Sequence, residues 1–382
     1  MISLSEYVFE SLGNLKLSEA DKNKLLALDK WYYDVNIKFR EYRPYILLNL
    51  EEEYEKFIKA YNAGAKYFPV LEHKPCPWGE ELVKDMERLY GEFGKFDCFL
   101  SKYYLECLYH LIGKARFYCG IDGPSRYVAN EGQAPSLELY EKAMQIIKTT
   151  DYKEPDKSDR NITDKEAKKM IEDHIKKLGY EWDVVLDPGM LPRMAVHPQK
   201  KMFIRPGATF SKDDIEGLKV HEIEAHIGRR YYGLKTGLYL FNFGLLWNID
   251  LDEGLAIWNS LNKVDKPKPN IMLNIAMKTV QAYQLDKMDF CELFDFCHKL
   301  IPEKDTFGLF QSICRFKREL CDCSIKGGNG DDASYLRGYY IVDKMSDEER
   351  DDILKYNIGP GQLGELNDIK KFLQINKFKP LI

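Results

Sequence analysis

The chain has 382 residues, of which 45% are hydrophobic and 31% are charged, and its formal net charge is −5 at pH 7. This composition is typical of a soluble globular protein, and the length suits one large domain or two domains of ordinary size. Phosphate binding requires a basic surface, so the negative net charge argues against a nucleic acid as the main partner.

No segment of the sequence has the pattern of a targeting or membrane element. The N-terminus lacks the basic and then apolar regions of a secretory signal. The longest apolar stretch, residues 238–247, is interrupted by Asn242 and Gly244 and is far too short to span a bilayer. The nine cysteines show no disulfide spacing, which favours free thiols in a reducing compartment. We therefore expect a cytoplasmic protein that does not insert into membranes.

The first half of the chain shows the helical period of apolar residues. Helices are expected within residues 1–60, where Leu25 and Leu28 begin such a pattern, and then at 80–90, 99–118, 137–148 and 162–178. The last of these begins with Thr163 and Glu166 in the positions of a capping box. Residues 1–178 are accordingly predicted to form a mainly helical N-terminal region.

The character of the sequence changes after residue 178. Three short runs with β-branched residues, at 182–186, 194–196 and 201–205, are separated by turn signals and predict a small antiparallel sheet. Ser211, with Asp214 three residues later, marks the start of a helix expected at about 212–228. A second helix is expected at about 252–262, followed by mostly helical chain to about residue 320. The predicted fold class is therefore α+β and mainly α-helical.

The motif His-Glu-x-x-x-His at residues 221–226 carries the chemistry of this sequence. Zinc binds neutral imidazole nitrogens and carboxylates, and a catalytic zinc site keeps one position open for water. Zinc lowers the pKa of that water towards about 7, and an adjacent carboxylate can accept its proton during attack on a carbonyl. His221 and His226 are therefore candidate metal ligands, and Glu222 is the candidate catalytic base.

The spacing of the two histidines makes a structural demand. In a regular α-helix, side chains five residues apart point about 140° away from one another. Both imidazoles can reach one ion only if the helix is locally underwound by a π-bulge or loosens in its last turn. Gly228, two residues after His226, is where we expect the helix to end.

A third ligand is expected from the acidic segment LDEGLA at residues 251–256, which is predicted to start the second helix. Carboxylates at a helix N-terminus often serve only as partners of the helix dipole. Beside the histidine motif, however, Glu253 is the natural third ligand. Two histidines on one helix and a glutamate on the next form the layout of gluzincin metallopeptidases. Residues 179–382 are therefore predicted to form a zincin-like catalytic region that binds one Zn²⁺ ion.

The segments HEIEAH and DEGLA resemble the tyrosine carboxypeptidase family, which includes the microtubule-associated tyrosine carboxypeptidases and the bacterial QEGLA-motif proteins. The resemblance covers roughly residues 60–345 and is strongest over 205–256. It implies a metallocarboxypeptidase that removes a C-terminal residue, with tyrosine or another aromatic residue as the candidate, from a protein or peptide with a free C-terminus. It also implies His221, His226 and Glu253 as zinc ligands and Glu222 as the catalytic glutamate.

The resemblance extends to candidate substrate-binding residues. The family's arginine after the second histidine corresponds to Arg230, and a later R-x-x-R stretch matches Arg315 and Arg318. A D-x-x-Y-x-x-G stretch matches Asp332, Tyr335 and Gly338. A bidentate arginine is the usual means of binding a terminal carboxylate, and Tyr335 is a candidate hydrogen-bond donor to the developing oxyanion.

The sequence also departs from the family pattern. Asp252 precedes Glu253 where the family has Gln or Glu, Tyr232 and Gly233 stand in place of Asn-Gly, and Asn259 and Ser260 stand near a usual acidic position. These changes leave the candidate metal ligands in place and bear on substrate identity. Two alternatives stay open. A non-haem iron site uses the same ligands of two histidines and one carboxylate, and a binding protein would hold the metal without turnover.

Overall fold

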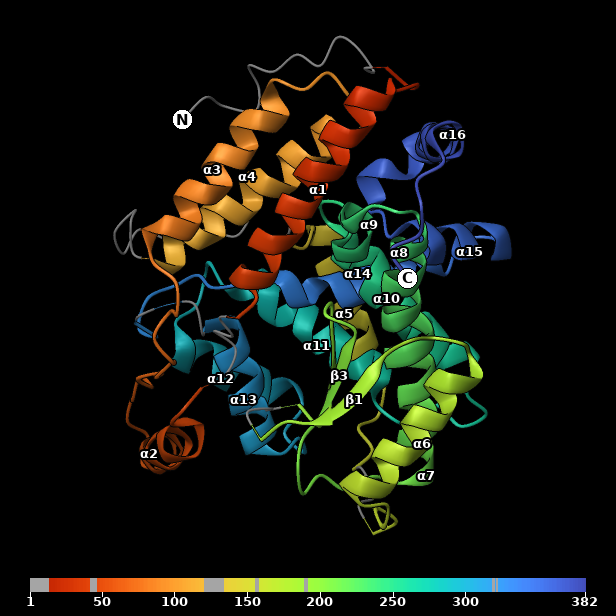
Figure 1. Cartoon of the computed structure of the whole chain (residues 1–382). Helices are drawn as coiled ribbons and strands as arrows, with labels where there is room; N and C mark the ends of the chain where they lie inside the picture. The colour runs from red at the N-terminus through yellow and green to blue at the C-terminus, as the bar shows by residue number, and fades with distance from the viewer. Residues whose placement is uncertain are drawn as a thin grey trace.

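The computed structural model describes residues 14–41, 47–119, 134–154, 158–188, 192–317, 320 and 322–382. Most of these residues are helical, and a small sheet lies between residues 183 and 204 (Figure 1). This agrees with the predicted α+β, mainly helical fold class. None of the helices in these ranges is both long enough and apolar enough to cross a membrane.

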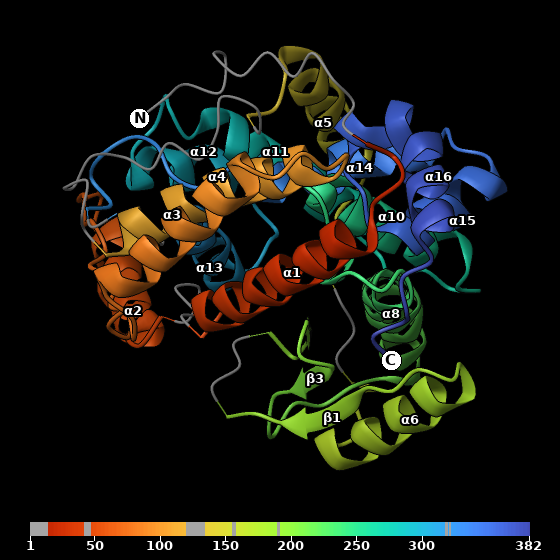
Figure 2. The same ribbon diagram turned by 45° about the horizontal axis from the view of Figure 1, so that its top comes forward.

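The helices that precede the sheet start and end close to the positions predicted from the apolar pattern. They are α1 (Glu19–Phe39), α2 (Leu50–Asn62), α3 (Glu80–Gly94), α4 (Ser101–Tyr118), α5 (Leu137–Thr149) and α6 (Asp164–Lys177). The capping box expected at the start of α6 is confirmed, because Thr163 accepts from the Glu166 backbone and Glu166 accepts in return. Figure 2 shows α1, α3 and α4 lying side by side, whereas α6 lies with the sheet.

The sheet contains β1 (Asp183–Leu186), β2 (Met194–His197) and β3 (Lys201–Ile204) in the order β1-β3-β2. Strands β2 and β3 pair in antiparallel fashion, as predicted, but β1 pairs parallel to β3. The sheet is therefore mixed. A tight turn in which Lys200 has a φ of 55° joins β2 to β3.

The remaining elements follow the sheet without another strand in the described residues. They are α7 (Lys212–Leu218), the π-helix η2 (Lys219–Ile227), α8 (Gly228–Lys235), α9 (Tyr239–Phe243), α10 (Asn248–Asn262), α11 (Ile271–Gln284), α12 (Phe290–Leu300), α13 (Thr306–Lys317), η3 (Asp331–Ala333), α14 (Ser334–Val342), α15 (Asp347–Tyr356), η4 (Pro360–Glu365) and α16 (Leu366–Asn376).

Three apolar cores meet at η2 and α10. The first joins α1, α3 and α4 to parts of α10 and α16, the second joins α2, α5 and α11–α13, and the third joins α6, the sheet and η2. Within η2, Ala225 belongs to the first core and Ile223 to the third; within α10, Leu255 belongs to the first core and Ile257 to the second. The first core contains residues from both sides of position 178. The predicted division into regions 1–178 and 179–382 therefore stays a prediction.

Helices α10 and α14 touch through their backbones. A Cβ atom on Gly338 would lie 1.7 Å from the Asp250 carbonyl oxygen, and one on Gly254 would lie 2.4 Å from the Gly338 carbonyl carbon. Neither position has room for a side chain. The glycines of the DEGLA and D-x-x-Y-x-x-G segments therefore have a packing role, which brings the residues before them close together.

Candidate metal centre

The two motif histidines come together because the helix that carries them is underwound. Helix α7 starts at a capping box formed by Ser211 and Asp214 and runs into the π-helix η2. Residues five apart in a π-helix lie on one face, and the ring centroids of His221 and His226 are 5.1 Å apart. Of the two distortions that the histidine spacing allowed, the structure has the π distortion and not a loosened last turn. The expected end at Gly228 is wrong, because Gly228 keeps helical φ and ψ angles and the chain continues as α8 to Lys235.

Glu253 approaches the histidines from α10. This helix begins at Asn248, earlier than predicted, after Trp247 in a left-handed conformation with a φ of 62°. Glu253 therefore lies in the second turn of α10 and is not at its N-terminus. Its position depends on the packing of α10 against η2 and α14 and not on the helix dipole.

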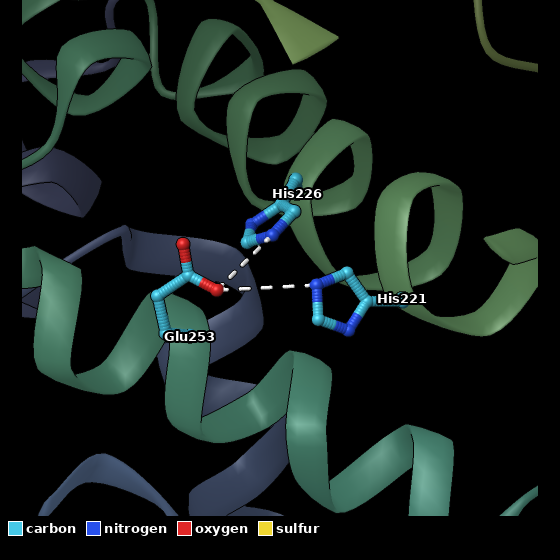
Figure 3. Close-up of side chains that lie close together, drawn as sticks. All are labelled: His221, His226 and Glu253. Atoms are coloured by element: carbon cyan, nitrogen blue, oxygen red, sulfur yellow. Dashed lines mark ion pairs between the residues drawn. The ribbon is translucent and has the colours of Figure 1, made fainter. Parts of the chain in front are cut away.

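The three candidate ligands point towards a common centre, as Figure 3 shows. The Oε2 atom of Glu253 lies 3.9 Å from Nε2 of His221 and 3.7 Å from Nε2 of His226. One ligand atom from each residue lies within 4.8 Å of the other two. Glu253 Oε2 is also buried and accepts no hydrogen bond from the described residues. A buried anionic acceptor left unsatisfied is costly, and a cation between these atoms would satisfy it.

The outer nitrogen of each imidazole has its own partner. Nδ1 of His226 lies 3.1 Å from a carboxylate oxygen of Asp252, and Nδ1 of His221 lies 3.2 Å from the hydroxyl of Ser260. That hydroxyl donates its proton to the Ala256 carbonyl, so it accepts from His221. In their neutral forms both rings then carry the proton on Nδ1 and leave the Nε2 lone pair facing the centre, which is the tautomer that binds a metal.

Asp252 is held in turn by a fully buried arginine. Nε of Arg229 lies 3.3 Å from the Asp252 carboxylate, and the Arg229 guanidinium also donates to the Asn357 side chain and the Ile358 carbonyl. The sequence flagged Asp252 and Ser260 only as departures from the family pattern. The structure places Asp252 against His226 and Ser260 against His221. Each pair is far apart in the sequence, so the sequence gave no sign of these contacts.

The charges in the centre give the two imidazoles different pKa values. Burial, with His226 nearby, lowers the pKa of His221 to about 3. Burial also acts to lower the pKa of His226, but the carboxylates of Asp252 and Glu253 outweigh it and raise that pKa to about 10. Burial raises the pKa of Glu222 to about 7; the Glu253 and Asp252 carboxylates add to the rise and His226 opposes it. A carboxyl group with a pKa near neutrality is suited to accept and return a proton.

Glu222 and His221 are among the residues that line a cavity of about 230 Å³. The walls of the cavity include side chains from α7, α10, α11 and the segment 264–268. Its lining residues are Asp213, Gly217, Leu218, His221, Glu222, Ile257, Ser260, Val264, Lys266, Pro267, Lys268 and Ile271. The candidate base therefore faces open space large enough for part of a substrate.

Tyr335 lies close enough to the centre for the carboxylates of Glu253 and Glu222 to act on its phenol. Burial raises the pKa of its phenol well above the ordinary value, and the carboxylates of Glu253 and Asp332 add to the rise, so the phenol keeps its proton at neutral pH. Arg315 donates to Asp332 at 2.9 Å, and Lys278 lies 3.3 Å from the same carboxylate with its ammonium 3.7 Å from the Tyr335 ring centroid. Lys278 was not among the candidate residues named from the sequence. In the sequence it is a single lysine in an apolar helix, and nothing there indicates that it lies near the site.

The other two arginines proposed from the sequence have different surroundings. Arg230 donates to the Asn242 carbonyl at the end of α9, at a distance of 3.0 Å. This contact ties α8 to α9, and the Arg230 guanidinium also acts electrostatically on Asp252, the residue next to Glu253. Arg318 lies outside the described residues. The roles of both in substrate binding stay predictions.

Comparison with known proteins gives one family. The family model described as microtubule-associated tyrosine carboxypeptidase matches residues 122–359, more than half of the chain. The match contains η2, α10 and α14. It begins at residue 122, whereas the resemblance in the sequence analysis was placed from about residue 60. No curated protein matches the chain.

Proposed function

The chain belongs to the microtubule-associated tyrosine carboxypeptidase family, and from this premise we propose that it is a zinc-dependent carboxypeptidase in which Glu222 is the catalytic base. Membership makes it a carboxypeptidase, that is, a hydrolase of peptide bonds. The proposed substrate is a protein or peptide with a free C-terminus. The family description names tyrosine, so a terminal tyrosine is the first residue to test.

One observation carries the metal assignment. The unsatisfied Oε2 atom of Glu253 lies less than 4 Å from Nε2 of both His221 and His226. Two ligands about 2.1 Å from one zinc ion cannot be more than about 4.2 Å apart, so small side-chain adjustments suffice for all three to bind it. Zinc held there would lower the pKa of a water molecule in its open position and polarise the peptide carbonyl.

The protein's own groups supply the proton transfers and the oxyanion contact. Glu222 accepts a proton from the attacking water and delivers it to the amine of the departing residue. The protonated phenol of Tyr335 donates a hydrogen bond to the carbonyl oxygen as negative charge develops on it. Asp252 and Ser260 keep the two imidazoles in the orientation and tautomer that metal binding needs.

The two alternatives are now unequal. The alternative of a binding protein without turnover was based on the absence of an acidic residue near Ser260. The Ser260 hydroxyl contacts His221 at 3.2 Å and can orient its ring, so an acidic residue is not needed there. A non-haem iron site shares the three ligands, but such a site needs no carboxylic base beside it. The buried Glu222 with its raised pKa favours hydrolysis. Metal analysis of the purified protein separates zinc from iron.

A peptide-library digestion read by mass spectrometry tests the proposal. We expect loss of one C-terminal residue, preferentially aromatic, from peptides with free C-termini. A chelator should abolish the reaction and added zinc should restore it. If a preparation carrying one zinc per chain releases no terminal residue from any peptide, the proposal is wrong.

A further inference from the structure

We propose that the cavity beside Glu222 and His221 binds the substrate's terminal residue, with the apolar walls around its side chain and Lys268 paired with its α-carboxylate. This inference rests on the proposed function, because it places the substrate of that same site. It differs from the sequence-based hypothesis, in which Arg315 or Arg318 binds the carboxylate.

The position of the cavity follows the chemistry. In a carboxypeptidase the group that departs is a single residue, and its new amine receives a proton from the catalytic base. That residue must therefore lie next to Glu222. Among the described cavities, the one lined by Glu222 is also lined by His221, so it opens directly onto the candidate metal centre. Tyr335, which would contact the carbonyl oxygen, does not line this cavity.

The size and lining of the cavity fit one large apolar side chain. Leu218, Ile257, Val264 and Ile271 contribute apolar wall. The volume of about 230 Å³ is below the range of about 300–1,000 Å³ that holds drug-sized ligands. A cavity of this size has room for the side chain of one terminal residue.

Lys268 supplies the charge at this cavity. Its ammonium lies 2.7 Å from Asp214, and the same carboxylate is bound by Arg193 at 2.6 Å and approached by Arg160 at 3.4 Å. One carboxylate shared among three cations leaves a positive excess, which favours a second anion. Lys268 lines the same cavity as Glu222 and His221, which places it on their side of the centre.

Arg315 and Lys278 are differently placed. Both contact Asp332, and neither lines the cavity. Asp213 and Lys266 also line the cavity, but both are exposed and their opposite charges offset each other. Lys268 is paired with the buried Asp214. The geometry therefore favours Lys268 for the α-carboxylate.

Binding to the Glu222→Gln variant tests the carboxylate contact without turnover. The probe is a fluorescent peptide ending in tyrosine, with a free carboxylate or as its amide, followed by anisotropy. We expect the free acid to bind at least tenfold more tightly than the amide, and Lys268→Gln to remove most of that difference. Lys268→Arg should retain it. As a matched control, Lys263→Gln should retain it too, because Lys263 pairs with Glu224 outside the cavity.

The outcomes separate the hypotheses. If Arg315→Gln removes the preference for the free acid and Lys268→Gln does not, the inference is overturned in favour of the sequence-based one. A preference retained in both variants also overturns it. Zinc content and thermal unfolding of each variant identify a folding defect; in that case Lys268→Arg decides, since it keeps the charge beside Asp214. Because binding is read without cleavage, an inactive wild-type protein would reject the proposed function and leave this test intact.

A second variant tests the side-chain pocket. A Cβ atom on Gly217 would lie 3.7 Å from Cε of Lys268 at the cavity wall, so Gly217→Leu should narrow the cavity. We expect kcat/KM for terminal tyrosine to fall at least tenfold relative to terminal alanine. Gly91→Leu is the control and should leave the ratio unchanged, because a Cβ atom on Gly91, in α3, would meet nothing within 4 Å. An unchanged ratio in Gly217→Leu would mean that the terminal side chain lies elsewhere.

Discussion

Nδ1 of His226 lies 3.1 Å from the carboxylate of Asp252, the residue immediately before the third candidate ligand, Glu253. One turn of α10 thus contacts the same imidazole twice, once through a candidate ligand and once through the partner that orients the ring. His221 has a neutral partner instead, Ser260. The two histidines therefore differ in basicity although they belong to one motif.

This difference predicts unequal effects on metal affinity. Asp252→Asn keeps the shape of the side chain but removes the charge that holds the His226 proton on Nδ1. We expect zinc affinity to fall about 10- to 100-fold, the usual cost of losing such a partner. Ser260→Ala removes a neutral acceptor and should cost less. Competition with a chromophoric chelator measures both, and equal affinities in the two variants would contradict the asymmetry.

Zinc binding should release a proton. In the metal-free protein the pKa of His226 is about 10, so at pH 8 the ring is protonated, and only its neutral form binds metal. Affinity should therefore rise by about tenfold per pH unit until the pH approaches about 10. Calorimetry in two buffers of different ionisation enthalpy at pH 8 counts the protons. No buffer dependence would show that His226 is already neutral.

Glu222→Gln should abolish cleavage and leave the metal in place. The amide fills the same space but cannot accept a proton from water, and loss of a general base typically costs about 10²- to 10⁴-fold in rate. His226→Ala is the contrasting variant, because it removes a ligand and should release the metal. The zinc-to-protein ratio and kcat are measured on the same preparations. Full activity in Glu222→Gln would exclude its role as base.

Tyr335→Phe should lower kcat and leave KM nearly unchanged. The phenol contacts the carbonyl oxygen most strongly after charge develops, so its loss affects the transition state more than substrate binding. Removal of one oxyanion donor costs about 10²- to 10³-fold in kcat in well-studied hydrolases. Steady-state kinetics on a peptide ending in tyrosine gives both constants. A rise in KM alone would make Tyr335 a binding residue instead.

Gly338→Ala should disturb the metal centre from outside it. The new methyl group would overlap the Asp250 carbonyl and force α10 and α14 apart. Overpacking of this kind costs about 1–3 kcal/mol or more. We expect a lower midpoint of thermal unfolding together with weaker zinc binding, because Glu253 is carried on α10. Gly361→Ala, which has open space around it, should leave both unchanged.

Features that depend on nearby residues were predicted from the sequence. The apolar period gave the helices α3 to α6, and the Thr163–Glu166 pair gave the start of α6, since each depends on residues within one or two turns. The spacing of His221 and His226, if both bind one ion, required either a π-bulge or a loosened last turn, and the structure has the π-helix. These predictions required no knowledge of which elements pack together.

Features that depend on distant packing were not. The parallel pairing of β1 with β3 depends on the order of strands in space, and the early start of α10 depends on a left-handed Trp247. Ser260 and Lys268 contact the site only because α10 and the segment after it fold back over η2. No periodicity or short motif encodes such a contact, so these residues became visible only in three dimensions.

The π-helix η2 can be regarded as an α-helix that holds one extra residue. Deleting a single position between the two histidines would give the four-residue spacing of an ordinary turn, where both imidazoles again share a face. The same deletion would rotate everything after it by about 100° around the helix axis. Arg229 would then leave its buried place beside Asp252, and the exposed side of α8 would turn inward. The histidine spacing and the helix that follows it are therefore coupled, and neither can change in length without the other.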